Sequence, residues 1–497
     1  MADGEATMNR NRARGILVVG LVGGCYSPNT PGGSGDGGET TAAGSESSGG
    51  LDATTQTESS VSATSADPTS ASAATSSPTD PSDTDADSTD SGPFCGDGVV
   101  DPDEVCDDGV NDSSYGSCTA DCSGFGPRCG DDVIQGEEIC DDGNDVDGDG
   151  CNTNCVESGT MLWSVVFDDG GMDGTATSVA ALPDGGIYVV GGGVLDWVKL
   201  LDADGTEVWD SPYPFGRPEG VAADEDGNAY VSGGAGRAVY EDGGGIIEQQ
   251  PTPYSVWDGT VTSDGNAVSV GTVDSFGAWT RRFGQDGVTL WTKVEPDDGF
   301  DAAWGVAIDT EESVLVAGQK GVVPTLLDGW LKKYDANGGE QWTFLYNSIV
   351  GNSSADNFQA VATGPDNEVA CAGGSGNESN MDVWVGLLTA DGDLSWSDTY
   401  SAFNGATFAS DVAIDAEGNV IVVATVPTSD DAETRVWVRK YAAAGVEMWT
   451  LEFVVDDGDS ASATVEGVAV NAEGEILVVG ATSTGGDTDP WIGKISA

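Results

Sequence analysis

The sequence contains no histidine and few basic residues. Its 497 residues include 17 Lys and Arg against 85 Asp and Glu, which gives a formal net charge of −68. Without an imidazole the chain cannot build a serine–histidine triad or a histidine-ligated metal site. A chain this acidic is repelled by phosphate backbones, so we expect no nucleic-acid partner. Chemistry based on carboxylates, on Ser–Lys pairs or on Ca²⁺ remains open.

Long apolar segments are scarce near the amino terminus. The apolar run at residues 15–24, GILVVGLVGG, has ten residues, about half of the roughly 20 that a membrane-spanning helix requires. Three arginines precede this run and Cys25 follows it. A basic cluster ahead of a short apolar run is typical of an export signal, so residues 1–25 are predicted to be a signal peptide.

The end of this run, Val22-Gly23-Gly24-Cys25, resembles the lipobox of bacterial lipoproteins. The resemblance implies that Cys25 carries acyl chains, each contributing about 0.8 kcal/mol per buried methylene, and that these chains anchor the protein in a membrane. Tyr26 follows where an Asp would indicate retention in the inner membrane. The resemblance therefore implies an outer-membrane lipoprotein at the cell surface. The alternative is a secreted protein whose signal contains a cysteine by chance.

Residues 26–92 are poor in apolar and basic side chains. The segment has no Lys or Arg, and its large apolar residues are Tyr26, Leu51 and Val61 in a background of Ser, Thr, Asp, Ala, Gly and Pro. Such a segment cannot offset its conformational entropy by burial, and its carboxylates repel one another. It is predicted to be a disordered linker between the anchor and the rest of the chain.

Eight of the ten cysteines lie in two matching sets within a predicted domain at residues 93–157. An even number of cysteines, in an exported chain and in units too small for a core of their own, predicts disulfides. Three pairings are open in each set. Zinc is the alternative, but it prefers close Cys-x2-Cys pairs, which these sets lack. The first set is Cys95, Cys106, Cys118 and Cys122, and the second is Cys129, Cys140, Cys151 and Cys155.

The words around these cysteines also repeat: CGDG at residue 95 matches CGDD at residue 129, and CDDG occurs at both residue 106 and residue 140. This wording resembles the cysteine-rich repeat of myxobacterial surface proteins. The resemblance implies an extracellular spacer without chemistry of its own, and a myxobacterial type of surface lipoprotein for the whole chain.

The second set encloses an acidic string with Asp145, Asp147 and Asp149 at alternate positions, followed by Gly150. Alternating carboxylates on a turn supply the oxygen ligands that Ca²⁺ prefers. The twelfth position is Val156, where an EF-hand needs a glutamate. The string is therefore a candidate Ca²⁺ loop of another kind, and a solvated acidic turn is the alternative. Ca²⁺ is the one cofactor that the sequence suggests.

Residues 159–497 contain a unit that recurs seven times, at intervals of about 48 residues. Each unit reads as two hairpins of short β-branched runs joined by Asp-Gly or Gly-Asn turns, without a helical period. This pattern predicts an all-β fold, a seven-bladed β-propeller. The last unit stops before its tryptophan-bearing strand, whereas Met161–Phe167 is such a strand without a unit. We expect the N-terminal strand to close the ring by pairing into the final blade.

The repeats resemble those of bacterial seven-unit propellers, and their tail, Asp-Ala-x-Gly-x-x-x-Trp, is similar to the tryptophan-docking motif of quinoproteins. Adjacent cysteines, often found in those enzymes, are absent, so we expect no quinone cofactor. The tryptophans are interpreted as packing wedges between blades. A recurrent set of cations is interpreted as pairing with local carboxylates, rather than as a ring for an anionic ligand. These cations are Lys199, Arg281, Lys332, Arg439 and Lys494.

The sequence thus predicts a monomeric, lipid-anchored cell-surface protein in which a disordered linker and a disulfide-rich spacer present a propeller. Its partners are the membrane, through the anchor, and a protein or glycan ligand that the sequence does not identify. No catalytic constellation is recognisable, so we do not expect an enzyme. The alternatives are an exported propeller enzyme that uses carboxylates or Ca²⁺, and an acidic structural component of a coat.

Overall fold

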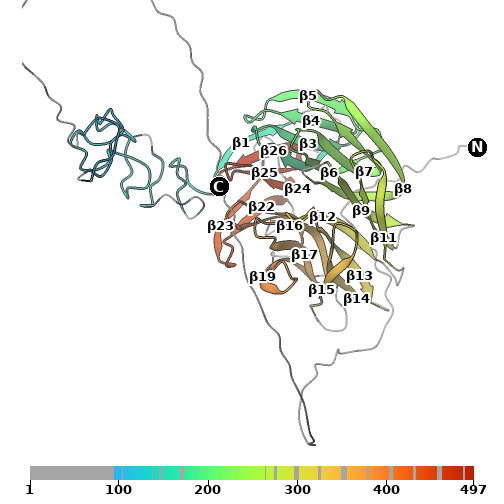
Figure 1. Ribbon diagram of the computed structural model, residues 1–497. Helices are drawn as coiled ribbons and strands as arrows, with labels where there is room; N and C mark the ends of the chain where they lie inside the picture. Colours follow the sequence, from blue (N-terminus) through green and yellow to red (C-terminus); the bar gives the residue numbers. More distant parts are fainter. Residues whose placement is uncertain are drawn as a thin grey trace, which may run out of the picture.

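The computed structural model describes residues 95–497 apart from short internal stretches, and the regular elements of the described part are all β-strands (Figure 1). No apolar helix of membrane-spanning length occurs in that part. The stretches that are not described are 103, 137, 145, 147, 149, 168–172, 263–264, 274–276, 296–300, 323–325, 349–354, 378–379, 402–406, 429–432, 456–461 and 485–486.

The strands form six antiparallel sheets, which are the blades of a ring. Four of them have four strands each in simple chain order. The first comprises β2 (Thr175–Ala181), β3 (Ile187–Gly192), β4 (Trp197–Leu201) and β5 (Glu207–Pro212). The second comprises β12 (Ala302–Ile308), β13 (Val314–Val322), β14 (Leu326–Tyr334) and β15 (Glu340–Tyr346). The third comprises β16 (Asn357–Thr363), β17 (Val369–Asn377), β18 (Asn380–Leu388) and β19 (Leu394–Tyr400), and the fourth comprises β20 (Ala409–Ile414), β21 (Val420–Pro427), β22 (Thr434–Tyr441) and β23 (Glu447–Phe453).

The fifth blade has six strands and corrects the predicted number of blades: the propeller has six, not seven. The strands are β6 (Pro218–Ala223), β7 (Ala229–Tyr240), β8 (Ile246–Val261), β9 (Ala267–Val273), β10 (Gly277–Phe283) and β11 (Thr289–Val294). The first half of β8 pairs with β7, and its second half pairs with β9. The second and third sequence units are therefore one continuous sheet, because no loop separates the last strand of one from the first strand of the next.

The sixth blade joins the two ends of the propeller, as expected. It consists of β1 (Met161–Val166), β26 (Asp487–Ile495), β25 (Ile476–Thr484) and β24 (Ser462–Val470), in that order. Trp163 lies opposite Lys494, and Val166 lies opposite Trp491. The backbone of Thr160 also exchanges hydrogen bonds with Ser496. Figure 1 accordingly shows the C-terminus beside β1. The ring closes because β2 packs against β6 on one side and against β24 on the other.

The core lies between neighbouring blades. The second strand of each blade is a run of buried apolar residues, as in Val420–Ala424 of β21, whereas the outer strands alternate between half-buried and exposed residues. In one cluster Val383 and Val385 of β18 pack with Val422 and Trp437 of the next blade. Each blade therefore buries its apolar faces against its neighbours, and no blade has a core of its own.

Candidate functional site

Two predicted sites fall outside the described residues. Cys25 lies in residues 1–94, and Asp145, Asp147 and Asp149 are undescribed positions within the second cysteine-rich repeat. The lipid anchor and the Ca²⁺ loop therefore stay predictions. The neighbour Gly148 is described, and it packs against the end of the Lys440 side chain and against Met448. Gly148 therefore lies beside the propeller, a placement that the sequence does not indicate.

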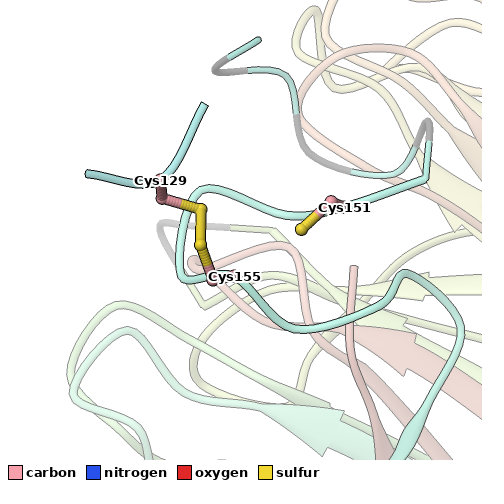
Figure 2. A group of neighbouring side chains, drawn as sticks. All are labelled: Cys129, Cys151 and Cys155. Atoms are coloured by element: carbon pink, nitrogen blue, oxygen red, sulfur yellow. A yellow bond between two sulfur atoms is a disulfide. The ribbon is translucent and has the colours of Figure 1, made fainter. Parts of the chain in front are cut away.

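All eight cysteines of the two repeats form disulfides, with the same nested pairing in each. The first and fourth cysteines are joined, Cys95 to Cys122 and Cys129 to Cys155, and the second pairs with the third, Cys106 to Cys118 and Cys140 to Cys151. Figure 2 shows the Cys129–Cys155 bond with Cys151 beside it. Sulfur and carboxylate atoms gather at three places in the described residues, but each group includes disulfide-bonded cysteines, which are not thiolate ligands.

Hydrogen bonds to carboxylates supplement these disulfides. Asp108 accepts bonds from the Ser117 hydroxyl and from the N–H groups of Asn111 and Cys118. These donors, the Ser117 hydroxyl first, lower the pKa of Asp108 well below its ordinary value. Ionised aspartates therefore stabilise the loops of the repeat through hydrogen bonds. This role explains part of its acidic composition without a bound ligand.

Reduction of the disulfides should unfold the repeats but leave the stability of the propeller unchanged. Each repeat is too small for a core, and several of its large apolar residues, such as Val100 and Ile134, are more than half exposed. We expect 10 mM dithiothreitol to unfold residues 95–155 and to leave the thermal transition of the propeller in place, because all four described disulfides lie in the repeats and Cys371 of the propeller is a free thiol. Proteolysis with mass spectrometry would check this, and a propeller that melts on reduction would contradict it.

The tryptophans of the outer strands dock on the following blade. Each ring packs against a glycine that has positive φ in the turn before the next outer strand: Trp291 on Gly338, Trp342 on Gly392. The indole N–H of these two rings donates to the carbonyl of Ala336 and of Ala390. The same packing of ring on glycine joins Trp163 to Gly205, Trp209 to Gly244, Trp396 to Gly445 and Trp449 to Gly159. The rings are packing wedges, as predicted.

Two places in the ring differ in the residues that supply this contact. At the closing blade Trp449 meets Gly159, so the residue that leads from the cysteine-rich repeats into β1 completes the docking contact. In the six-stranded blade the first half of β8 has no tryptophan. There the side-chain amide of Gln250 donates to the Gly287 carbonyl instead, and Arg237 pairs with Glu248 beside it. The sequence indicates this difference through the Gln-Gln-Pro-Thr-Pro segment at residues 249–253.

Most of the recurrent cations pair locally, as expected. Lys199 contacts Glu207 at 2.5 Å, Lys332 contacts Glu295 at 2.8 Å, and Lys494 contacts Glu475 at 2.7 Å. Arg439 lies 3.3 Å from Glu447 and 3.7 Å from Asp398. The fifth cation, Arg281, contacts the Thr292 hydroxyl and the Trp279 ring instead. A ring of free cations around the propeller is thus not present in the described residues.

Carboxylates of the inner strands connect neighbouring blades. Asp258 accepts the backbone N–H of Val306, and Asp411 accepts that of Val468, in each case from the next blade at 2.9 Å. The buried Asp356 accepts bonds from both N–H and hydroxyl of Ser348 and from the Gly376 N–H, while burial raises its pKa. These acids have structural partners, and their geometry supports no specific reaction.

The fold and disulfides define a β-propeller protein with an N-terminal pair of disulfide-stapled repeats. Residues 114–156 match the model of a domain of unknown function, DUF4215. No curated protein matches the chain.

Three solved structures are similar at low identity. They are a protein of unknown function from Bacteroides caccae (13% identity, 56% of this chain and 97% of the other, TM-score 0.38), the WD40 β-propeller domain of Doa1 (14%, 67% and 97%, 0.42) and the Dos1 propeller (10%, 67% and 94%, 0.41). The propeller assignment rests on the sheet topology of this chain.

Proposed function

We propose that this chain is an exported, lipid-anchored protein of the cell surface that presents its propeller as a binding domain. The order of its parts carries the proposal: a short apolar run ending in Val22-Gly23-Gly24-Cys25, an acidic linker at residues 26–92, two stapled repeats, and a closed ring. Four disulfides support export, because such bonds persist in oxidising compartments.

The connection between spacer and propeller supports presentation of a rigid body. Gly148 and Gly159 pack on side chains of β22 and β23, and the Ser496 hydroxyl donates to the Glu157 carbonyl at 2.8 Å. The second repeat is therefore fastened to the blade of β20 to β23 and, through Ser496, to the closing blade. Binding surfaces of such a ring are held in fixed relation to the spacer, whereas the linker sets the distance from the membrane.

Anchoring is tested by expressing the whole chain in a Gram-negative host with radiolabelled palmitate. We expect the label in the unaltered chain and in the membrane fraction, and neither in Cys25→Ser, because this variant lacks the acceptor thiol. Cys371→Ser is the matched control and should be labelled like the unaltered chain. Equal labelling of Cys25→Ser would overturn the anchor, and protection of the propeller from protease added to intact cells would overturn surface exposure.

Binding is tested separately with residues 95–497 immobilised on beads and exposed to cell-surface extract. A component that is retained, and that is displaced by excess soluble 95–497, supports a binding domain. The proposal fails if nothing is displaced over a range of salt concentrations, and turnover of a substrate in the same extract would favour the enzyme alternative.

A further inference from the structure

Four of the third strands carry a cation at the same place, two residues before the strand ends. Each of these cations lies over aromatic rings: Lys199 over Phe167 and Trp197, and Arg439 over Tyr400 and Trp437, with nitrogen or guanidinium carbon 4.8 to 5.6 Å from the ring centres. The full set is Lys199 on β4, Arg281 on β10, Lys332 on β14 and Arg439 on β22.

Three of the four cations receive a carboxylate from the outer strand of their own blade. The acids are Glu207, Glu340 and Glu447, each two residues before the outer tryptophan and each opposite the last residue of the third strand. Their carboxylate oxygens lie 2.5 Å from Lys199, 3.5 Å from Lys332 and 3.3 Å from Arg439. The preceding blade adds a second acid for two of them, Glu295 and Asp398.

Arg281 lacks both acids. The outer-strand place is occupied by Thr289, which lies opposite Phe283, the last residue of β10. By register with the tryptophan-bearing strands, Gln250 and Thr252 of β8 occupy the places that correspond to Asp398 and Glu295. In the part of the chain that the structure describes, Arg281 has no carboxylate partner. Its contacts are a 3.1 Å hydrogen bond from Nε to the Thr292 hydroxyl and the rings of Tyr254, Trp279 and Phe283.

Arg439 is a close internal comparison for this site. Its Nε donates to Thr450, the residue after the outer tryptophan, as Arg281 donates to Thr292. Its Nη1 lies 3.3 Å from a Glu447 oxygen and 3.7 Å from an Asp398 oxygen. The same guanidinium geometry therefore occurs twice, once with acids and once without. A guanidinium held this way on aromatic rings is prepared for a bidentate carboxylate.

The strand beside Arg281 differs from the other outer strands as well. Among the outer strands, β11 is the one that carries a base, Lys293, and no acid. It is a sheet edge, and Val288, Leu290 and Val294 at this edge are 54 to 59% exposed. Acidic residues on β5, β15, β19 and β23 oppose pairing with another acidic segment. This protection is missing on β11.

We propose that the β11 edge and Arg281 form a docking site for an extended polypeptide segment that carries one acidic side chain. The segment adds a strand beside β11, packs apolar side chains on Val288, Leu290 and Val294, and places one carboxylate on Arg281. Charge complementarity selects this occupant, since a local positive site on an acidic surface admits one carboxylate but opposes a polyanion. The inference rests on the proposed role of the propeller as a binding domain and names its surface and partner chemistry.

The test uses residues 95–497 and a labelled, end-blocked hexapeptide of alternating threonine and valine with one central glutamate. Fluorescence anisotropy at low salt measures binding. We expect Arg281→Gln to weaken binding at least tenfold. Thr289→Glu should do the same while retaining the arginine, because the new acid would occupy Arg281 as Glu447 occupies Arg439. Arg439→Gln is the matched control and should bind as the unaltered protein does.

Further probes identify the occupant. The glutamine form of the peptide should bind at least tenfold more weakly than the glutamate form. A galacturonate trimer that binds through Arg281 while the peptide does not would overturn the polypeptide as occupant. Peptide binding that survives Arg281→Gln, or no binding at millimolar peptide, would overturn the site. A partner displaced from the bead assay equally well by Arg281→Gln protein would leave the binding domain standing and remove only this inference.

Discussion

Removal of β1 should abolish the single cooperative unfolding of the propeller. We expect residues 168–497 to lose a defined thermal transition or to aggregate, because β26 would become an exposed edge and Trp163 would no longer pack on Gly205. Circular dichroism melting and size-exclusion chromatography measure this. Trp163→Ala, which keeps the strand, should cost about 3 kcal/mol, near the lower end for such truncations because Trp163 is half-buried.

A permuted chain distinguishes the missing strand from damage by truncation. When residues 158–167 are placed after Ala497, Gly159 takes the turn position that Gly205 and Gly338 occupy in other blades, so the transition should return. Deletion of residues 26–92 is the neutral control. If residues 168–497 melted as cooperatively as the permuted chain, the closing strand would not be a structural requirement.

This closure could be read from the sequence because it follows from counting strands. One tryptophan-bearing segment at Met161 had no hairpin of its own, and the last unit at Trp491 had no outer strand. The docking of outer tryptophans on turn glycines also follows from short sequence motifs that recur. Both features depend on residues within one repeat. Such residues are recognisable in the sequence because they recur in each repeat.

The number of blades was wrong because it depends on whether hydrogen bonding stops between units. Repeat counting assigns a blade to each unit, but the ladder through β8 continues where Pro251 and Pro253 replace the usual inter-blade loop. The contact between Gly148 and Lys440 was also beyond prediction, since it joins two unlike domains and follows no repeat. The environment of Arg281 could not be predicted without the strand register. Thr289 becomes significant only when it is compared with the acids at the equivalent positions of the other outer strands.

Buried ion pairs between strands and turns should dominate the mutational sensitivity of the ring. Lys333 lies 2.8 Å from Asp309 with both side chains at most 4% exposed, and Lys440 lies 3.1 Å from the similarly buried Asp415. Asp309 also accepts the N–H groups of Glu311 and Ser313, so it cannot move to water without losing the turn. We expect Lys333→Met to cost about 3–5 kcal/mol in unfolding free energy, because an unpaired carboxylate stays buried.

The double variant Lys333→Met with Asp309→Asn should recover much of this loss, since the asparagine oxygen still accepts the two N–H groups without a buried charge. Lys199→Met is the matched exposed case. Its partner Glu207 is 45% exposed, so the loss should be about 0–1 kcal/mol. Urea denaturation of these proteins, of the single variant Asp309→Asn and of the unaltered protein measures the coupling energy of the buried pair. A Lys333→Met protein as stable as Lys199→Met would show that the buried pairs are solvated, and that the acids of this ring are held chiefly by backbone N–H groups.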